Sequence, residues 1–113
     1  MDKTVSDLAS GKCKPCEGGV APLKEPEIRK LLKQIPGWEY ANGRIAKTYE
    51  FKNYYQTMAF VNAAAWISHR EDHHPDMMAG YSKCRVEYWT HAINGLSEND
   101  FICAAKLDKL FDL

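Results

Sequence analysis

Residues 84–91 alternate between two kinds of side chain, and this stretch limits the possible folds more than any other. One set is apolar or small, and it comprises Cys84, Val86, Tyr88 and Thr90. The other set is more polar, and it comprises Arg85, Glu87, Trp89 and His91. A period of two is that of a β-strand with one buried and one exposed face. The pattern therefore predicts a sheet covered on one side, with His91 on its more polar face at a strand end.

The rest of the chain carries the signals of further helices and strands. Helical periodicity predicts helices over residues 26–34 and 54–70, and a third helix that begins at Ser97. One hairpin is expected over 38–40 and 44–51, joined through Asn42-Gly43, and a second over 77–81 and 84–91. The order α-β-β-α-β-β-α predicts a four-stranded antiparallel sheet with three helices packed on one face, an α+β domain.

Two of these helices have recognisable first turns. Asn53 can cap the helix over 54–70 with Gln56 reaching back, and Ser97 and Asp100 have the same spacing at the last helix. Within 54–70, one narrow face carries the apolar or small residues Tyr54, Met58, Val61, Ala65 and Ser68. We expect this face to lie on the sheet.

Length and composition favour one domain. The chain has 113 residues, and we expect residues 24–113 to form a single domain behind a polar, flexible N-terminal segment, 1–23, that packs little. Its 15 basic residues balance 15 acidic ones, so no general attraction to nucleic acid or to a membrane is expected. Without an apolar run of signal-peptide or membrane-spanning length, we expect a cytoplasmic protein.

The four cysteines are expected to be reduced thiols in that compartment. Cys13 and Cys16 form a CxxC pair, but the sequence has no second such pair to complete a structural zinc site. Solvated thiols are therefore the first interpretation of this pair, and partial metal binding is the second. Cys84 and Cys103 fall on apolar stripes, which favours places in the core.

Three of the four histidines lie within a short stretch, at His69, His73 and His74. Imidazole gains and loses protons near neutral pH, so such a cluster indicates acid–base chemistry. A metal site is the alternative, because His69 and His73 would share one helix face. The zincin pattern needs Glu directly after the first histidine, however, and Arg70 stands there, so no metal is expected. Tyr81 and Trp89 are aromatic candidates for the same site.

A set of spaced motifs resembles the pterin-4a-carbinolamine dehydratase family. The motifs are Asp72-His73-His74-Pro75, Tyr81, Val86, Trp89-Thr90-His91, Gly95-Leu96-Ser97 and Asp100. The segments 13–19 (CKPCEGG) and 35–38 (IPGW) are similar to prokaryotic members. The resemblance implies the reaction in which 4a-hydroxytetrahydrobiopterin (pterin-4a-carbinolamine) loses water to give quinonoid dihydropterin. This step recycles the cofactor of aromatic amino-acid hydroxylases.

The resemblance also implies which residues act. His73, His74 and His91 would be the catalytic acid–base trio. The substrate-binding residues would be Asp72, Trp89 and Thr90, with Asp100 as support from the last helix and Tyr81 as a more distant member. The chain departs from the family pattern at His69, where members commonly have Glu, and at Asn99, where some have a basic residue.

No cofactor of the protein's own is expected, since one acid and one base suffice for the dehydration. The implied partners are the pterin substrate, further copies of the chain in a homodimer or homotetramer, and an aromatic amino-acid hydroxylase. A non-catalytic role on the same fold, as a protein-binding cofactor or an assembly factor, is the alternative function.

Overall fold

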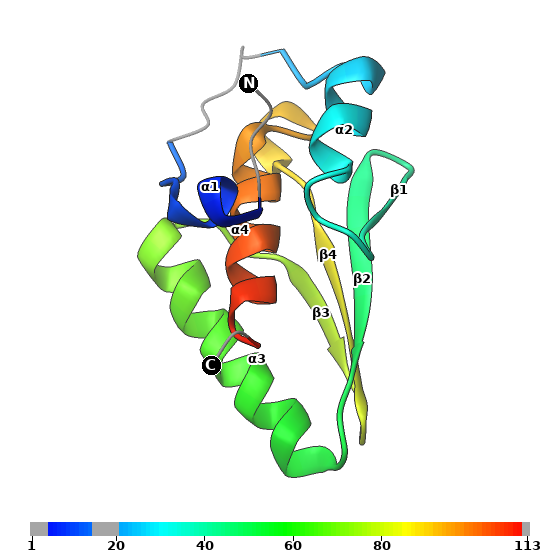
Figure 1. The fold of residues 1–113 in the computed structure, drawn as a ribbon, viewed down its shortest axis with the longest axis vertical. Coiled ribbons are helices and arrows are strands. Elements are labelled where there is room, and N and C mark those ends of the chain that lie inside the picture. Colours follow the sequence, from blue (N-terminus) through cyan, green and yellow to red (C-terminus); the bar gives the residue numbers. More distant parts are fainter. Residues whose placement is uncertain (1–4, 15–20, 112–113) are drawn as a thin grey trace.

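The computed structural model describes residues 5–14 and 21–111. Its helices are α1 (Val5–Ser10), α2 (Glu25–Leu32), α3 (Tyr54–Glu71) and α4 (Glu98–Lys109), with a short 3₁₀ helix at His91–Ile93. Its strands are β1 (Glu39–Ala41), β2 (Arg44–Glu50), β3 (Asp76–Ala79) and β4 (Lys83–Tyr88). The strands form one antiparallel sheet in the order β1-β2-β4-β3, so each sequential hairpin lies at one side of the sheet (Figure 1).

Strand β4 lies inside the sheet and divides its side chains as the alternation predicts. Val86 pairs with Lys47 of β2 on one side and with Met77 of β3 on the other. Cys84, Val86 and Tyr88 are fully buried, whereas Arg85 is exposed. The prediction of a sheet with one covered face is confirmed.

Helices α3 and α4 cover that face and complete the α+β architecture (Figure 1). The core side of α4 is buried along most of its length, from Phe101 to Leu107. Its C-terminal end is tied to the first hairpin through Asp108, whose carboxylate accepts hydrogen bonds from Trp38, Lys47 and Tyr49. The predicted fold class is therefore correct. In the described part of the chain, no helix is long and apolar enough to cross a membrane.

Helix α1 is an additional element that the sequence analysis did not predict. It packs against α4, with the Leu8 side chain only 1% exposed, and Lys106 Nζ donates to the carbonyl of Ala9 over 2.7 Å. The expectation that residues 1–23 pack little is thus wrong for Val5–Ser10. The polar composition of the segment gave no sign that Leu8 would make an apolar contact with the core. Residues 15–20, including Cys16, lie outside the described residues.

Helix α3 begins as predicted but presents a different face to the sheet. The Gln56 amide donates to Asn53 Oδ1 over 2.9 Å, which confirms the cap, while Gln56 Oε1 accepts from the Lys52 amide instead of reaching Asn53. The buried residues are Thr57, Phe60 and Ala64; of the predicted face, Tyr54 and Ala65 are exposed. Apolar side chains are spread around this helix, so their spacing could not select the buried face.

Candidate active site

The end of α3 separates two histidines that the sequence placed on one helix face. Asp72 adopts the left-handed conformation (φ 51°, ψ 43°) and ends the helix, so His73 lies outside any helix or strand. His69 remains on α3, exposed, with its ring stacked on that of Trp66 at a centroid distance of 5.6 Å. The shared helix face of His69 and His73, on which the alternative metal site depended, is therefore absent, because the helix stops between them.

His73 is held by a carboxylate in the first turn of α4. Its Nε2 lies 2.7 Å from Asp100 Oδ1, and the Asp100 side chain is completely buried. The other carboxylate oxygen accepts from Thr90 Oγ1 at 2.8 Å and from the Ser97 amide at 3.0 Å. Asp100 therefore caps α4, as predicted, and orients a histidine with the same side chain.

Tyr88 forms the support on one side of the His73 ring. The two rings are nearly parallel, at 6° to one another, with centroids 5.8 Å apart. Burial raises the pKa of Tyr88 well above its ordinary value, so its hydroxyl stays neutral. The face of the His73 ring thus packs on an uncharged aromatic ring, and its Nε2 contacts a buried carboxylate.

His91 comes from a different element, at the start of the 3₁₀ helix that follows β4. The preceding Thr90 donates its amide to the carbonyl of Gly95 over 2.8 Å, which closes this loop. The His91 ring makes edge contacts with Trp89 and His74, at centroid distances of 4.7 and 5.3 Å. The loop therefore places the His91 ring beside that of His74, a contact that the spacing of these residues in the sequence could not predict.

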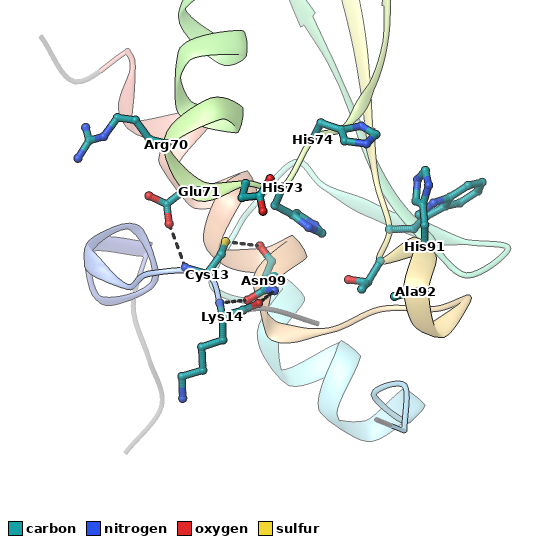
Figure 2. Close-up of a pocket in the computed structure, with 12 residues that line it drawn as sticks. Cys13, Lys14, Arg70, Glu71, His73, His74, His91, Ala92 and Asn99 are labelled. Atoms are coloured by element: carbon teal, nitrogen blue, oxygen red, sulfur yellow. Dashed lines mark hydrogen bonds between the residues drawn. The ribbon is translucent and has the colours of Figure 1, made fainter. Parts of the chain in front are cut away.

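The three predicted histidines line one cavity of about 500 Å³ (Figure 2). Its walls comprise Cys13, Lys14, Arg70, Glu71, Asp72, His73, His74, Trp89, Thr90, His91, Ala92 and Asn99. Small-molecule sites span roughly 300–1,000 Å³, so the cavity is of a suitable size for a ligand with two fused rings. The structure thus brings together His73, His74 and His91 with three of the expected binding residues, Asp72, Trp89 and Thr90.

Two of the expected binding residues lie elsewhere. Tyr81 is 69% exposed, and its carbonyl accepts from Thr57 in the first turn of α3, whereas the cavity lies at the last turn. Asp100 lies beneath the wall, not in it, so it supports His73 and does not itself face a ligand. Neither residue lines the cavity, and the sequence analysis had given Asp100 only a supporting place and Tyr81 a more distant one.

One wall of the cavity comes from the N-terminal segment, which the sequence analysis did not assign to the site. The Lys14 amide donates to Asn99 Oδ1 over 3.0 Å, and Asn99 Nδ2 donates back to the Lys14 carbonyl over 2.6 Å. The Cys13 amide donates to Glu71 Oε1 over 2.9 Å (Figure 2). The similarity of residues 13–19 to prokaryotic family members is the sequence signal that could have indicated this wall.

The side chains around the cavity favour proton transfer. Three imidazoles line it, and imidazole is the side chain that most often gives and accepts protons in enzymes. Trp89 adds an aromatic ring to the wall, with the Arg44 guanidinium packed over one face at 3.2 Å from the ring centroid. Among residues 5–14 and 21–111, no group of three or more His, Cys, Asp and Glu side chains is arranged to hold a metal ion.

Comparisons with known proteins agree with this site. The family model described as Pterin 4 alpha carbinolamine dehydratase matches residues 21–110. A Nitrosospira multiformis protein, provisionally named pterin-4-alpha-carbinolamine dehydratase, is 66% identical over 113 residues and covers all of both chains. A Nitrosomonas europaea protein with the same provisional name is 71% identical over 108 residues, covering 95% of this chain and 96% of that protein.

A solved structure extends the agreement to three dimensions. The crystal structure of a transcriptional coactivator/pterin dehydratase from Brucella melitensis has a TM-score of 0.76 and 28% sequence identity. The match covers 79% of this chain and 97% of that chain. The family model, the relatives and the shared fold establish that this chain belongs to the pterin-4-alpha-carbinolamine dehydratase family of hydro-lyases.

Proposed function

We propose that the chain converts 4a-hydroxytetrahydrobiopterin to quinonoid dihydropterin and water by histidine acid–base catalysis. The observation that carries the proposal is the convergence of His73, His74 and His91 on one cavity, with His73 bonded to the buried Asp100. The physiological role that follows is recycling of the cofactor used by an aromatic amino-acid hydroxylase, which supplies the substrate.

The reaction needs one proton donor and one acceptor. Hydroxide is a poor leaving group, so the 4a-hydroxyl must be protonated as its bond to carbon breaks. As this bond breaks, the neighbouring ring nitrogen donates an electron pair to form a C=N double bond and loses its own proton. Positioned side chains typically contribute about 10²- to 10⁴-fold to such proton transfers.

Asp100 makes His73 the suitable base. A carboxylate at Nε2 favours the tautomer with its proton on that nitrogen, which leaves Nδ1 to accept the proton of the pterin. The same carboxylate then stabilises the imidazolium that forms. We assign protonation of the hydroxyl to the His74–His91 pair, whose rings meet edge to face at the opposite wall.

Binding of the planar pterin is assigned to the aromatic and polar parts of the wall. Trp89 offers a ring for stacking, and Thr90 and Asp72 offer backbone groups beside the histidines. Because the substrate reaches the protein already formed, no further cofactor takes part in this mechanism.

The direct test is stopped-flow decay of a 4a-hydroxytetrahydropterin with and without the purified protein. We expect catalysed decay that chelating agents leave unchanged, because the proposed groups are all side chains. Decay at the uncatalysed rate would refute the proposed activity, and loss of catalysis on chelation would refute the metal-free mechanism.

We further propose that the chain acts as a homodimer or homotetramer. Large aromatic side chains remain exposed on the outside of α3, with Tyr55 81% and Trp66 62% exposed, and burial of such groups stabilises association. Light scattering of the purified protein is expected to give a multiple of 12.9 kDa. A monomer at micromolar concentration would contradict this part of the proposal.

A second candidate function is protein binding on the same fold. It is supported by the same exposed aromatic residues and by the description of the Brucella protein as a transcriptional coactivator. A His91→Ala variant without dehydratase activity that still captures one dominant partner would favour this function. If the only protein that this variant captures is an aromatic amino-acid hydroxylase, the result would favour the recycling role instead.

A further inference from the structure

Two thiols from distant parts of the chain lie in direct contact beside the cavity. Cys13 Sγ and Cys103 Sγ are 3.3 Å apart, although 90 residues separate them in sequence. Cys13 lies in the segment that follows α1 and lines the cavity, whereas Cys103 lies within α4. The proposed dehydration uses neither sulfur.

We propose that Cys13 and Cys103 form a redox modification site at which a peroxide generates a reversible intrachain disulfide. The site is independent of the proposed dehydratase activity, because it depends only on the placement of the two thiols. It also accounts for a cysteine at position 13, which the sequence left as a solvated thiol.

The two sulfurs differ in access. Cys103 is fully buried, so a dissolved oxidant cannot reach it without opening the core. Cys13 is partly exposed at the cavity wall, where a molecule as small as hydrogen peroxide can approach it. Cys13 is therefore the sulfur that reacts first.

The protonation state of Cys103 also favours Cys13 as the sulfur that is oxidised first. Its hydrogen bond to Cys13, followed by burial, raises the pKa of Cys103 well above its ordinary value. Cys103 therefore keeps its proton until its partner has been oxidised, and that proton is then available to the leaving hydroxide.

The bonds and electrons balance in two steps. The Cys13 sulfur attacks one peroxide oxygen, the O–O bond breaks, and Cys13 sulfenic acid and one water are produced. The Cys103 sulfur then attacks the Cys13 sulfur, the S–O bond breaks, and hydroxide leaves with the Cys103 proton as a second water. Two thiols are oxidised and one peroxide is reduced to two waters, and a reducing dithiol reverses the product.

The segment around Cys13 can make the movement that bond formation requires. A disulfide joins its sulfurs at about 2.05 Å, so the contact must shorten by roughly 1.3 Å. Cys103 is fixed within α4, whereas Cys13 lies outside any helix or strand. Within the described residues, the Cys13 sulfur has hydrogen-bonding contacts with Cys103 and, at 3.7 Å, with the Asn99 carbonyl, and the second contact is too long to oppose the movement strongly.

A disulfide at this place would fasten the wall of the cavity to α4 covalently. In the reduced protein the wall is held by hydrogen bonds between the backbone of Cys13 and Lys14 and the side chains of Glu71 and Asn99. Oxidation would therefore fix the position of Cys13 and Lys14 beside the histidines. The site offers a way for peroxide to change the shape of a ligand cavity.

The test is peptide mapping of the full chain after brief treatment with hydrogen peroxide and alkylation of the remaining thiols. We expect a Cys13–Cys103 linked peptide, a loss of about 2 Da from the monomer, and full reversal by dithiothreitol. A Cys13–Cys16 linkage, an irreversible oxygen adduct on Cys13 with Cys103 still alkylated, or four unreacted thiols would each overturn the proposal.

Variants of the other cysteines show which thiols form the linkage. They avoid a Cys103 substitution, which could disturb folding because Cys103 is buried in the core. Cys16→Ser and Cys84→Ser are expected to retain the linkage, and Cys13→Ser to abolish it. Loss of the linkage in Cys16→Ser would assign the chemistry to the CxxC pair and contradict the proposal. Cys84 is the suitable control because it is another fully buried thiol of the same core.

Discussion

The imidazole of His73 owes its orientation to one buried side chain. Asp100 meets it at 2.7 Å and also accepts from Thr90 and from the Ser97 amide. The Ser97 hydroxyl lies 2.7 Å from Thr90 Oγ1, so Ser97, Thr90 and Asp100 form a continuous series of hydrogen bonds to His73, the proposed base. Under the proposed mechanism, Asp100 would therefore affect proton transfer without contacting the ligand.

Replacing Asp100 with Asn tests this role at the scale of one residue. The variant keeps the volume but loses the charge that stabilises a protonated His73. A hydrogen bond to a charged group contributes about 1.5–3 kcal/mol, which corresponds to a fall in kcat of roughly 10- to 100-fold. Steady-state kinetics should show this fall with little change in KM.

Ser97→Ala is the matched control for Asp100→Asn. It removes the Ser97 hydroxyl, which lies at the end of the hydrogen-bond series. It keeps the hydrogen bond from the Ser97 amide to the Asp100 carboxylate and the contact of that carboxylate with His73. We expect a kcat within about threefold of the native value, since an uncharged hydrogen bond contributes only about 1 kcal/mol. Equal kcat values for the native protein and Asp100→Asn would contradict the role assigned to the carboxylate.

Single residues were predictable where a motif fixes them and not where the fold does. The motif selected His73, His74 and His91, which the structure brings to one cavity, and the spacing of Ser97 and Asp100 gave the cap. The distance of Tyr81 from the cavity depends on the direction of the β3–β4 hairpin, which is a property of the folded chain. The outward position of His69 follows from the exact end of α3, which a sequence pattern does not determine.

At the scale of elements, the segment between α1 and residue 15 acts as part of the site. Asn99 binds both the amide and the carbonyl of Lys14, so one side chain holds the backbone as a neighbouring strand would. Asn99 is 7% exposed, and loss of its amide would leave these backbone groups without their partner. The wall therefore depends on a contact between the N-terminal segment and α4.

Replacing Asn99 with Ala should loosen this wall. Hydrogen–deuterium exchange is expected to become faster at the amides of Cys13 and Lys14, because two hydrogen bonds of about 0.5–1.5 kcal/mol each are lost. The KM for the hydroxypterin should rise severalfold while kcat stays within about threefold, since the histidines are not moved.

Asn62→Ala provides the matched comparison for Asn99→Ala. Asn62 is an exposed amide on α3, outside the cavity, so both exchange and KM should remain native. Faster exchange in Asn99→Ala with an unchanged KM would show that the segment does not contribute to substrate binding.

Helices and strands were predicted correctly where the local sequence pattern that marks them is strong. The strict alternation of β4 gave the correct face, and caps at Asn53 and Ser97 gave the starts of α3 and α4. Helix α1 has six residues, too few for a helical period to be visible in the sequence, although its Leu8 side chain is strongly buried. Its stability comes from packing on α4, which is a long-range contact.

For the whole molecule, several buried groups resist deprotonation. Burial raises the pKa of Cys84, and that of Tyr49 is raised by burial and by its hydrogen bond to Asp108. Cys103 and Tyr88 shift in the same direction. Glu87 shifts the other way, because hydrogen bonds from Arg85 and then Arg44 lower the pKa of its carboxyl.

These shifts predict that the free energy of unfolding decreases in alkali. Cysteine and tyrosine in an unfolded chain lose protons near pH 8.5 and 10, so above those values the folded state binds more protons. Their contribution is complete below pH about 8.5 and is lost as pH rises towards the folded-state pKa values. Glu87 has the opposite sign: its contribution is present above pH about 4.3 and is lost as pH falls through its lowered folded-state pKa.

Urea unfolding between pH 7 and 10.5 measures this dependence. The native protein should lose stability steadily above pH about 8.5, and Cys84→Ala should show a shallower decline from its own starting value. A free energy of unfolding that stays constant to pH 10.5 would contradict the assigned shifts.

The central claim concerns three of four histidines, and the fourth provides the comparison. Single alanine variants at His73, His74 and His91 remove rings that line the cavity, whereas His69→Ala removes one that stacks on Trp66 outside it. Stopped-flow decay of a 4a-hydroxytetrahydropterin is predicted to slow about 10²- to 10⁴-fold for the cavity variants and to remain within about threefold for His69→Ala. Equal rates in all four variants, or a loss confined to His69→Ala, would contradict the account.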